Sequence, residues 1–120
     1  MRMNEVIYDD SKPVEGYGPG FFRIGGAVHT GAVLLLPSGV TNWGGYDDLT
    51  PLLNALSAID VLLMGTGDEI AHLPVAARAA FDEAGLGVEL MATPTACRTY
   101  NVLLSEGRRI GAALLPVAKV

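Results

Sequence analysis

The sequence predicts a single α/β domain, and three observations carry that prediction. The chain has 120 residues, a usual length for one domain built around one hydrophobic core. From Asp60 onward, short apolar runs alternate with amphipathic stretches, a pattern typical of βαβ units and a parallel sheet. The first third of the chain instead carries short strand-like runs separated by glycine and proline. We therefore expect residues 1–120 to form one domain.

The chain is expected to begin with an irregular lead-in over residues 1–20. This stretch ends in Gly16-Tyr17-Gly18-Pro19-Gly20, where glycine and proline disfavour regular structure. The first strand is expected over Phe21–Val28, since Phe22, Ile24 and Val28 fall on one side of an extended chain.

An antiparallel hairpin is expected next. The run Val33–Leu36 stops at Pro37, and Gly31 supplies turn chemistry before it. We expect these residues to form the second arm of a hairpin joined near Gly31. A third short strand is expected over Val40–Trp43.

Three helices are expected, and two of them begin with a threonine followed by proline. Threonine is a good N-cap, and proline suits the first helical position because its missing N–H would have no partner there. These starts are Thr50-Pro51 and Thr93-Pro94, and the helix from Thr93 is expected to run to about Ser105. The remaining helix begins at Leu73-Pro74 and ends at Gly85, where a left-handed residue is favoured.

Strands are expected between these helices. Val61–Met64 is continuously apolar, as a strand buried on both faces requires. Gly87–Met91 and Arg109–Leu115 are the other two candidates, the last one ending before Pro116.

Charge and cysteine content exclude several classes of protein. The net charge of −5, with only 8 lysines and arginines, disfavours binding to nucleic acid or to a membrane surface. One cysteine excludes an internal disulfide and a zinc site made of several thiolates. No run approaches the ~20 apolar residues of a transmembrane helix, and the start lacks a secretory signal, so we expect a cytoplasmic protein.

The hydrophobic content predicts association with another protein. Half of the residues are hydrophobic, and the mean hydropathy is +0.36. A chain this short and apolar is expected to leave apolar surface that a partner protein or a second copy covers.

The segment Gly65-Thr66-Gly67 is the first candidate ligand-binding element. It follows a buried strand, and open α/β sheets bind ligands at the carboxyl ends of their strands. A dinucleotide is disfavoured, because Asp68 and Glu69 would repel a pyrophosphate and the next helix starts too far along the chain. The alternative interpretation is that the glycines only permit a tight turn.

The start of the third helix is the second candidate element. Its first turn exposes free N–H groups near Thr95 and Arg98, a combination suited to a carboxylate or sulfate-sized anion. On a helical wheel, however, Arg98 falls on the outer side, as expected of a solvated cation. Tyr100 is either a contact of this site or a core residue. A pocket for a small anion is expected between these residues and Gly65–Gly67.

The sequence contains no complete catalytic or metal-binding constellation. Cys97 lies near a helix start beside Arg98, which favours a thiolate, but its wheel position places it on the buried side with Ala96 and Tyr100. His29 and His72 belong to no metal-ligand spacing. Asp47 and Asp48 are interpreted as stabilising the dipole of the helix that follows. We therefore predict no catalytic residue, no metal and no cofactor.

Several segments in order resemble one family over about Gly20 to Val117. The segments are Phe22-Arg23-Ile24-Gly25-Gly26, Gly31-Ala32-Val33-Leu34-Leu35, Trp43, Gly65-Thr66-Gly67, Thr99-Tyr100-Asn101-Val102-Leu103 and Arg109-Ile110-Gly111-Ala112-Ala113-Leu114. They resemble a small domain of unknown function found in bacteria, archaea, an adipogenesis-associated animal protein and a mitochondrial complex I (NADH dehydrogenase) assembly factor. The present chain is expected to be a bacterial member.

This resemblance implies a three-layer fold. A mixed central sheet would be covered by helices on one side and by a β-hairpin plus a helix on the other. It also implies a protein without established enzymatic activity, whose mitochondrial relative binds partner proteins during assembly.

Two functions are therefore expected from the sequence. The first is a non-catalytic protein-interaction or assembly-type factor. The alternative is a small-molecule or anion-binding enzyme that uses the cleft at Gly65–Gly67 and the start of the third helix.

Overall fold

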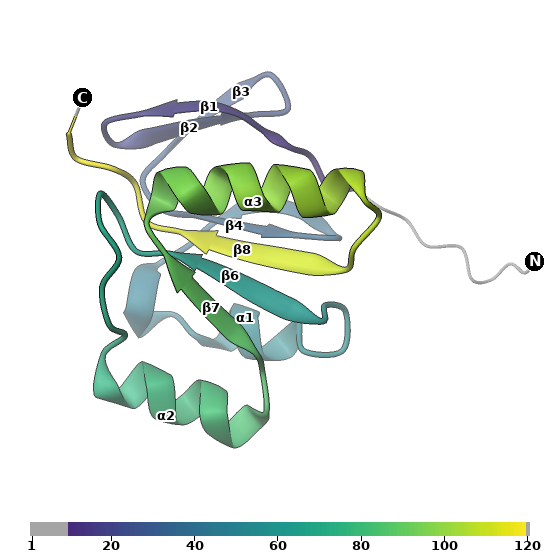
Figure 1. The fold of residues 1–120 in the computed structure, drawn as a ribbon, viewed down its shortest axis with the longest axis vertical. Helices are drawn as coiled ribbons and strands as arrows, with labels where there is room; N and C mark the ends of the chain where they lie inside the picture. Colours follow the sequence, from purple (N-terminus) through teal and green to yellow (C-terminus); the bar gives the residue numbers. More distant parts are fainter. Residues whose placement is uncertain (1–9, 120) are drawn as a thin grey trace, which may run out of the picture.

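A five-stranded mixed sheet forms the middle layer of the structure, a computed structural model that describes residues 10–119 (Figure 1). Its strand order is β5-β4-β8-β6-β7. β6 pairs in parallel with β7 and β8, whereas β4 pairs antiparallel with β5 and β8. These strands are β4 (Val33–Leu36), β5 (Gly39–Asn42), β6 (Val61–Gly65), β7 (Val88–Met91) and β8 (Ile110–Leu114). The predicted parallel βαβ units are confirmed.

Helices cover both faces of this sheet. α3 (Thr93–Ser105) packs on β6 and β8 on one face, while α1 (Thr50–Asn54) and α2 (Val75–Ala84) contribute to a second core on the other (Figure 1). Side chains along β6 alternate between the cores: Leu63 joins the first, and Leu62 and Met64 join the second. A strand buried on both faces reads as a continuous apolar run, which explains the sequence of β6. A short 3-10 helix, η2 (Gly45–Asp47), precedes α1.

A second sheet lies beside α3. Its antiparallel strands are β1 (Val14–Gly18), β2 (Phe21–Ile24) and β3 (Ala27–Thr30), in that order. Phe22 and Ile24 point into the same core as Leu35 of β4 and Tyr100 of α3. The small sheet and α3 therefore share one face of the central sheet, which confirms the predicted three-layer arrangement.

The predicted single strand Phe21–Val28 is wrong. Gly25 and Gly26 have φ values of 61° and 80°, so the chain turns there and forms a hairpin of β2 and β3. Two successive positive φ values are the requirement of a type I′ hairpin turn, and glycine meets it without steric cost.

The predicted hairpin joined near Gly31 is also wrong. Gly31 has a φ of 87°, but β3 before it and β4 after it belong to different sheets. β4 forms its hairpin with β5 instead, through the Pro37-Ser38 turn. The positive φ at Gly31 therefore marks the crossing between sheets.

The predicted lead-in contains regular structure. β1 occupies Val14–Gly18 within residues 1–20, and its pairing with β2 provides the backbone bonds that an isolated glycine-rich segment would lack. Residues 1–9 of the predicted lead-in lie outside the described residues.

The predicted positions of the three helices are confirmed. Thr50 and Thr93, however, do not cap α1 and α3. Leu49 and Ala92 occupy the N-cap positions of α1 and α3, and neither helix has a side-chain cap bond. Gly85 ends α2 with a φ of 74°, as predicted. Across residues 10–119, no helix has both the length and the apolar character needed to cross a bilayer.

Candidate functional site

The carboxyl ends of the three parallel strands are bonded directly to one another. Leu115 N donates to Gly65 O at 2.9 Å, and Thr66 N donates to Met91 O at 2.9 Å. Thr93 N then donates to Gly67 O at 2.8 Å. The glycine turn and the start of α3 are therefore in contact, as predicted from a parallel sheet.

The Thr93 side chain holds this edge together from inside. Thr93 is fully buried. Its hydroxyl donates to Leu115 O at 2.7 Å and accepts a bond from Gly67 N at 2.9 Å. A buried polar group is tolerated when such bonds satisfy it. One hydroxyl thus joins the segments that follow β6 and β8 to the first turn of α3.

Gly65 is required by this close packing. A Cβ at position 65 would lie 2.8 Å from Thr93 Oγ1 and 2.9 Å from Leu114 Cδ2. Gly67 follows with a φ of 105°, a conformation that side chains rarely adopt. Both glycines therefore have structural reasons to be glycine.

The Thr66 hydroxyl orders the loop between β6 and α2. The hydroxyl donates toward two carbonyl oxygens, Glu69 O at 2.7 Å and Met91 O at 3.2 Å. Its oxygen accepts a bond from Ala71 N at 3.1 Å. Thr66 therefore bonds to backbone on both sides and fixes the path of this loop.

A hollow of about 300 Å³ opens beside this edge. Its charged lining residues are Asp68, Glu69 and Lys119, and its other lining residues are Tyr17, Pro94 and Val117. The Asp68 carboxylate accepts bonds from Ala118 N at 3.1 Å and from Lys119 N at 3.2 Å. The volume is at the lower end of the range of about 300–1,000 Å³ seen for small-molecule pockets.

The predicted contacts on α3 lie apart from this hollow's lining. Thr95 and Arg98 are exposed, and Arg98 Nη2 lies 3.4 Å from Thr95 Oγ1 on the same helix. Tyr100 is fully buried in the core that includes Phe22 and Leu35. Of the predicted residues, Gly65, Thr66 and Gly67 lie together at the carboxyl edge, but none of the six lines the hollow.

Sequence reasoning missed the roles of Thr93 and Asp68. Thr93 was interpreted only as a helix cap, although its position between a strand and a helix start is where a hydroxyl can reach a neighbouring loop. Asp68 was considered only as a repulsive charge. Its carboxylate accepts a bond from the backbone N–H of Ala118, fifty positions away in the chain, and no local sequence pattern shows such a contact.

The Cys97 thiol is buried, which confirms its predicted packing. Burial raises its pKa to about 12, and the nearby Arg98 guanidinium only partly opposes this effect. The thiol therefore stays protonated near neutral pH. No group of three or more His, Cys, Asp or Glu placed to hold a metal ion occurs in residues 10–119.

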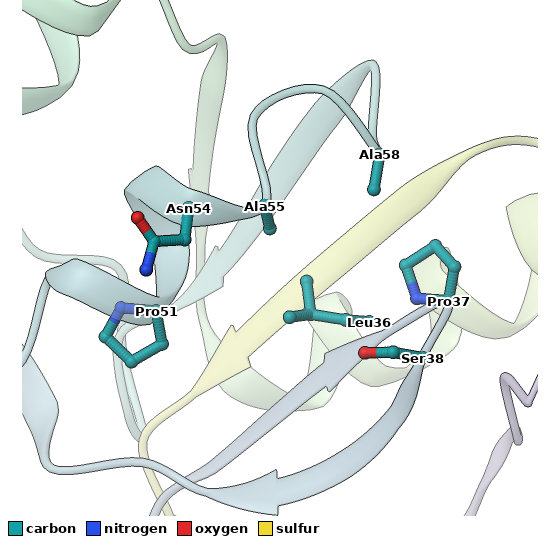
Figure 2. A pocket seen from close by; sticks show the side chains of 7 residues that line it. All are labelled: Leu36, Pro37, Ser38, Pro51, Asn54, Ala55 and Ala58. Carbon is teal, nitrogen blue, oxygen red and sulfur yellow. The ribbon is translucent and has the colours of Figure 1, made fainter.

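A second hollow lies between α1 and the turn that joins β4 to β5 (Figure 2). Its volume is about 250 Å³, and none of its lining residues is charged. Figure 2 shows one wall from the α1 region facing the turn across the gap; the lining residues are Leu36, Pro37, Ser38, Pro51, Asn54, Ala55 and Ala58. We call this hollow the α1 groove. Sequence reasoning did not find it, because its walls come from distant segments.

Comparison with known proteins gives a consistent set of matches. Residues 14–115 match a family described as "Protein of unknown function (DUF498/DUF598)". The chain is 51% identical over 117 residues to an uncharacterised protein of Rhodobacter capsulatus, covering 98% of this chain and 94% of that protein.

Two further matches involve a human protein and a solved structure. The chain is 36% identical over 110 residues to human "NADH dehydrogenase [ubiquinone] 1 alpha subcomplex assembly factor 3", covering 86% of this chain and 60% of the human protein. A crystal structure described as an outer membrane protein from Bartonella henselae matches with a TM-score of 0.81 at 34% identity, covering 92% of this chain and 98% of that one. The chain thus spans about 60% of the human relative's length.

Proposed function

The chain belongs to the DUF498/DUF598 family, and we propose that it is a non-catalytic protein-interaction module that acts as an assembly-type factor. The observation that carries this proposal is that the polar side chains at the carboxyl edge are occupied by bonds within the fold. The hydroxyls of Thr66 and Thr93 and the carboxylate of Asp68 all bond to backbone of neighbouring segments. Open α/β sheets usually place reactive groups at this edge. Here the polar groups at the edge are used to hold the fold together.

The relatives support the same proposal. The human protein that shares 36% of aligned residues is named an assembly factor for an NADH dehydrogenase subcomplex. By this relationship, the partners of the present chain would be subunits of a bacterial NADH dehydrogenase. A cytoplasmic location is part of the proposal, although a related structure is described as an outer membrane protein.

The α1 groove is the surface that we assign to the partner. Its lining is mostly apolar and carries no charge, so burial of an apolar side chain of another protein there removes apolar surface from water without desolvating a charged group. The neighbouring strand β5 lies at the edge of the central sheet, where backbone groups remain available for pairing. A second copy of the chain is the other occupant that this surface could accept.

Cross-linking in the bacterial host tests this assignment. Ala58 is exposed and lines the groove, so Ala58→Asp should place a charge there without disturbing the core. We expect cross-links to NADH dehydrogenase subunits, or to a second copy, to fall at least tenfold in this variant. Ala76→Asp, at an exposed position on α2, is the matched control and should retain them. Equal cross-linking in both variants would exclude the groove.

A small-molecule or anion-binding enzyme is the second candidate. The hollow of about 300 Å³ beside the glycine turn favours it. The residues predicted to bind the ligand of this candidate are Gly65, Thr66, Gly67, Thr95, Arg98 and Tyr100; none of them lines the hollow, and Arg98 is the exposed cation among them. Sulfate, phosphate or small carboxylates should then raise the melting temperature, and Arg98→Ala should weaken that effect. Failure of all three anions to stabilise the wild-type protein would count against this candidate.

A further inference from the structure

A third hollow, which we call the inter-sheet hollow, lies between the small sheet and the hairpin of β4 and β5. Its volume is about 380 Å³, larger than the α1 groove or the hollow at the carboxyl edge. Small-molecule pockets usually occupy about 300–1,000 Å³. The walls include Asp10 and Lys12 from the segment before β1, Ile24 and His29 from the hairpin of β2 and β3, and Ser38 and Val40 from the hairpin of β4 and β5. The inter-sheet hollow is therefore large enough for a small molecule.

Two opposite charges line this hollow from one segment. Asp10 and Lys12 both line it, whereas Ser11 between them does not, as alternate positions of an extended chain would. The Lys12 stem lies against the turn between β2 and β3, since a Cβ on Gly25 would be 2.6 Å from Lys12 Cδ. The backbone N–H of Asp10 donates to Pro37 O at 2.9 Å. One carboxylate and one lysine side chain are therefore placed at the same hollow.

The fold does not use the polar side chains of this hollow. Within residues 10–119, four polar side chains of the lining form neither a hydrogen bond nor an ion pair; they are those of Asp10, Lys12, His29 and Ser38. The carboxyl edge differs, because the hydroxyls of Thr66 and Thr93 are bonded to backbone there. The polar groups of the inter-sheet hollow are thus available to a ligand.

Two aliphatic side chains complete the lining. Ile24 is only 2% exposed and belongs to the core beneath the small sheet. Val40 is half-buried and packs against the same core. A hydrocarbon group that covers them removes apolar surface from water. A ligand that matches the whole lining therefore carries an anionic group, a cationic group and a small hydrocarbon part.

We propose that the inter-sheet hollow binds a small aliphatic zwitterion, of the class of the α-amino acids leucine and valine. The ligand carboxylate pairs with Lys12, its ammonium group pairs with Asp10, and its side chain lies on Ile24 and Val40. A simple carboxylate would face the Asp10 charge, and a simple amine would face the Lys12 charge, without compensation. This inference goes beyond the proposed function, because it needs no NADH dehydrogenase.

Titration with L-leucine, followed by NMR, tests the proposal on the wild-type protein. Millimolar leucine should shift the amide signals of Ile24, Gly39 and Val40. Isocaproate lacks the ammonium group of leucine, and isoamylamine lacks its carboxylate, so each should bind at least tenfold more weakly. Glycine lacks the aliphatic side chain and should also bind more weakly than leucine.

Two variants test the role of each charge. Lys12→Gln should weaken leucine binding at least tenfold and abolish the preference for leucine over isoamylamine. Asp10→Asn should weaken it equally and abolish the preference for leucine over isocaproate. Arg108→Gln and Asp47→Asn are the matched controls, since they change exposed charges that do not line the hollow. Both controls should bind leucine as the wild-type protein does.

Three results would overturn the inference. They are the absence of shifts with both leucine and valine, equal binding of leucine, isocaproate and isoamylamine, and unchanged leucine affinity in Lys12→Gln and Asp10→Asn. Ser38 also lines the α1 groove, so it is left unchanged in these experiments. The effect of Ala58→Asp on cross-links is independent of all three results. Failure of this inference is therefore distinguishable from failure of the proposed function.

Discussion

Asn101 on α3 pairs with the backbone of Val14 in β1 much as a neighbouring strand would. Its side-chain oxygen accepts a bond from Val14 N at 2.8 Å, and its side-chain nitrogen donates to Val14 O at 2.9 Å. Val14 is buried and Asn101 is half-buried, so water can replace these bonds only in part. One amide therefore fixes the small sheet to the helix beside it.

Replacing Asn101 with alanine should destabilise the protein by about 2–3 kcal/mol, because both backbone groups of Val14 lose their partners. Chemical denaturation measures this change. Ser105→Ala is the control on the same helix, since its hydroxyl bonds Val102 O at an exposed position and should cost less than about 0.5 kcal/mol. Similar losses in both variants would contradict the assigned role of Asn101.

Thr93→Val should be more harmful than Thr93→Ser. Valine keeps the shape of the side chain but removes the hydroxyl that bonds Gly67 N and Leu115 O. The loss should be about 2–4 kcal/mol of unfolding free energy, since two backbone groups are left unpaired. Serine retains the hydroxyl and should recover much of this stability. Equal stability of the two variants in urea titration would show that the bonds contribute little.

Gly65→Ala should destabilise the carboxyl edge through steric contact alone. The new Cβ would lie 3.2 Å from the Cα of Thr93, which is backbone and cannot rotate away. Overpacking of this kind typically costs about 1–3 kcal/mol. Gly87→Ala is the matched control, because its Cβ would meet no atom within 4 Å. The difference between their melting temperatures checks the prediction.

The Cys97 thiol should make stability depend on pH in the alkaline range. Its pKa rises from 9.0 to about 12 in the folded protein because of burial. The unfolded chain loses the proton first, so this contribution to stability is complete below pH 9 and declines as pH rises toward 12. Cys97→Ala should flatten the dependence between pH 9 and 10.5. Rapid labelling of the native thiol at neutral pH would contradict its burial.

The sequence predicts those parts of the fold that depend on local patterns. The βαβ region was located correctly because apolar runs, prolines and Gly85 mark its elements directly. The first third was predicted less well, since Gly25-Gly26 and Gly31 both permit turns. Choosing between these turns depends on which sheet receives each strand, and that is decided by packing between distant residues.

The candidate site was only partly predictable for the same reason. The glycine turn and the start of α3 could be placed together, because the ends of parallel strands meet at one edge. The bonds that occupy this edge could not be predicted. The partners of Thr93 and Asp68 are 22 to 51 residues away in the chain, and the α1 groove also joins distant segments.

The amount of assembled NADH dehydrogenase in a bacterial host lacking this gene tests the proposed function most directly. Native gels and NADH oxidation by isolated membranes measure that amount. We expect a several-fold decrease after deletion, restored by the wild-type gene and by Arg98→Ala, but not by Ala58→Asp. Unchanged levels of the assembled enzyme after deletion, or full restoration by Ala58→Asp together with failure of Arg98→Ala, would contradict an interaction role through the α1 groove.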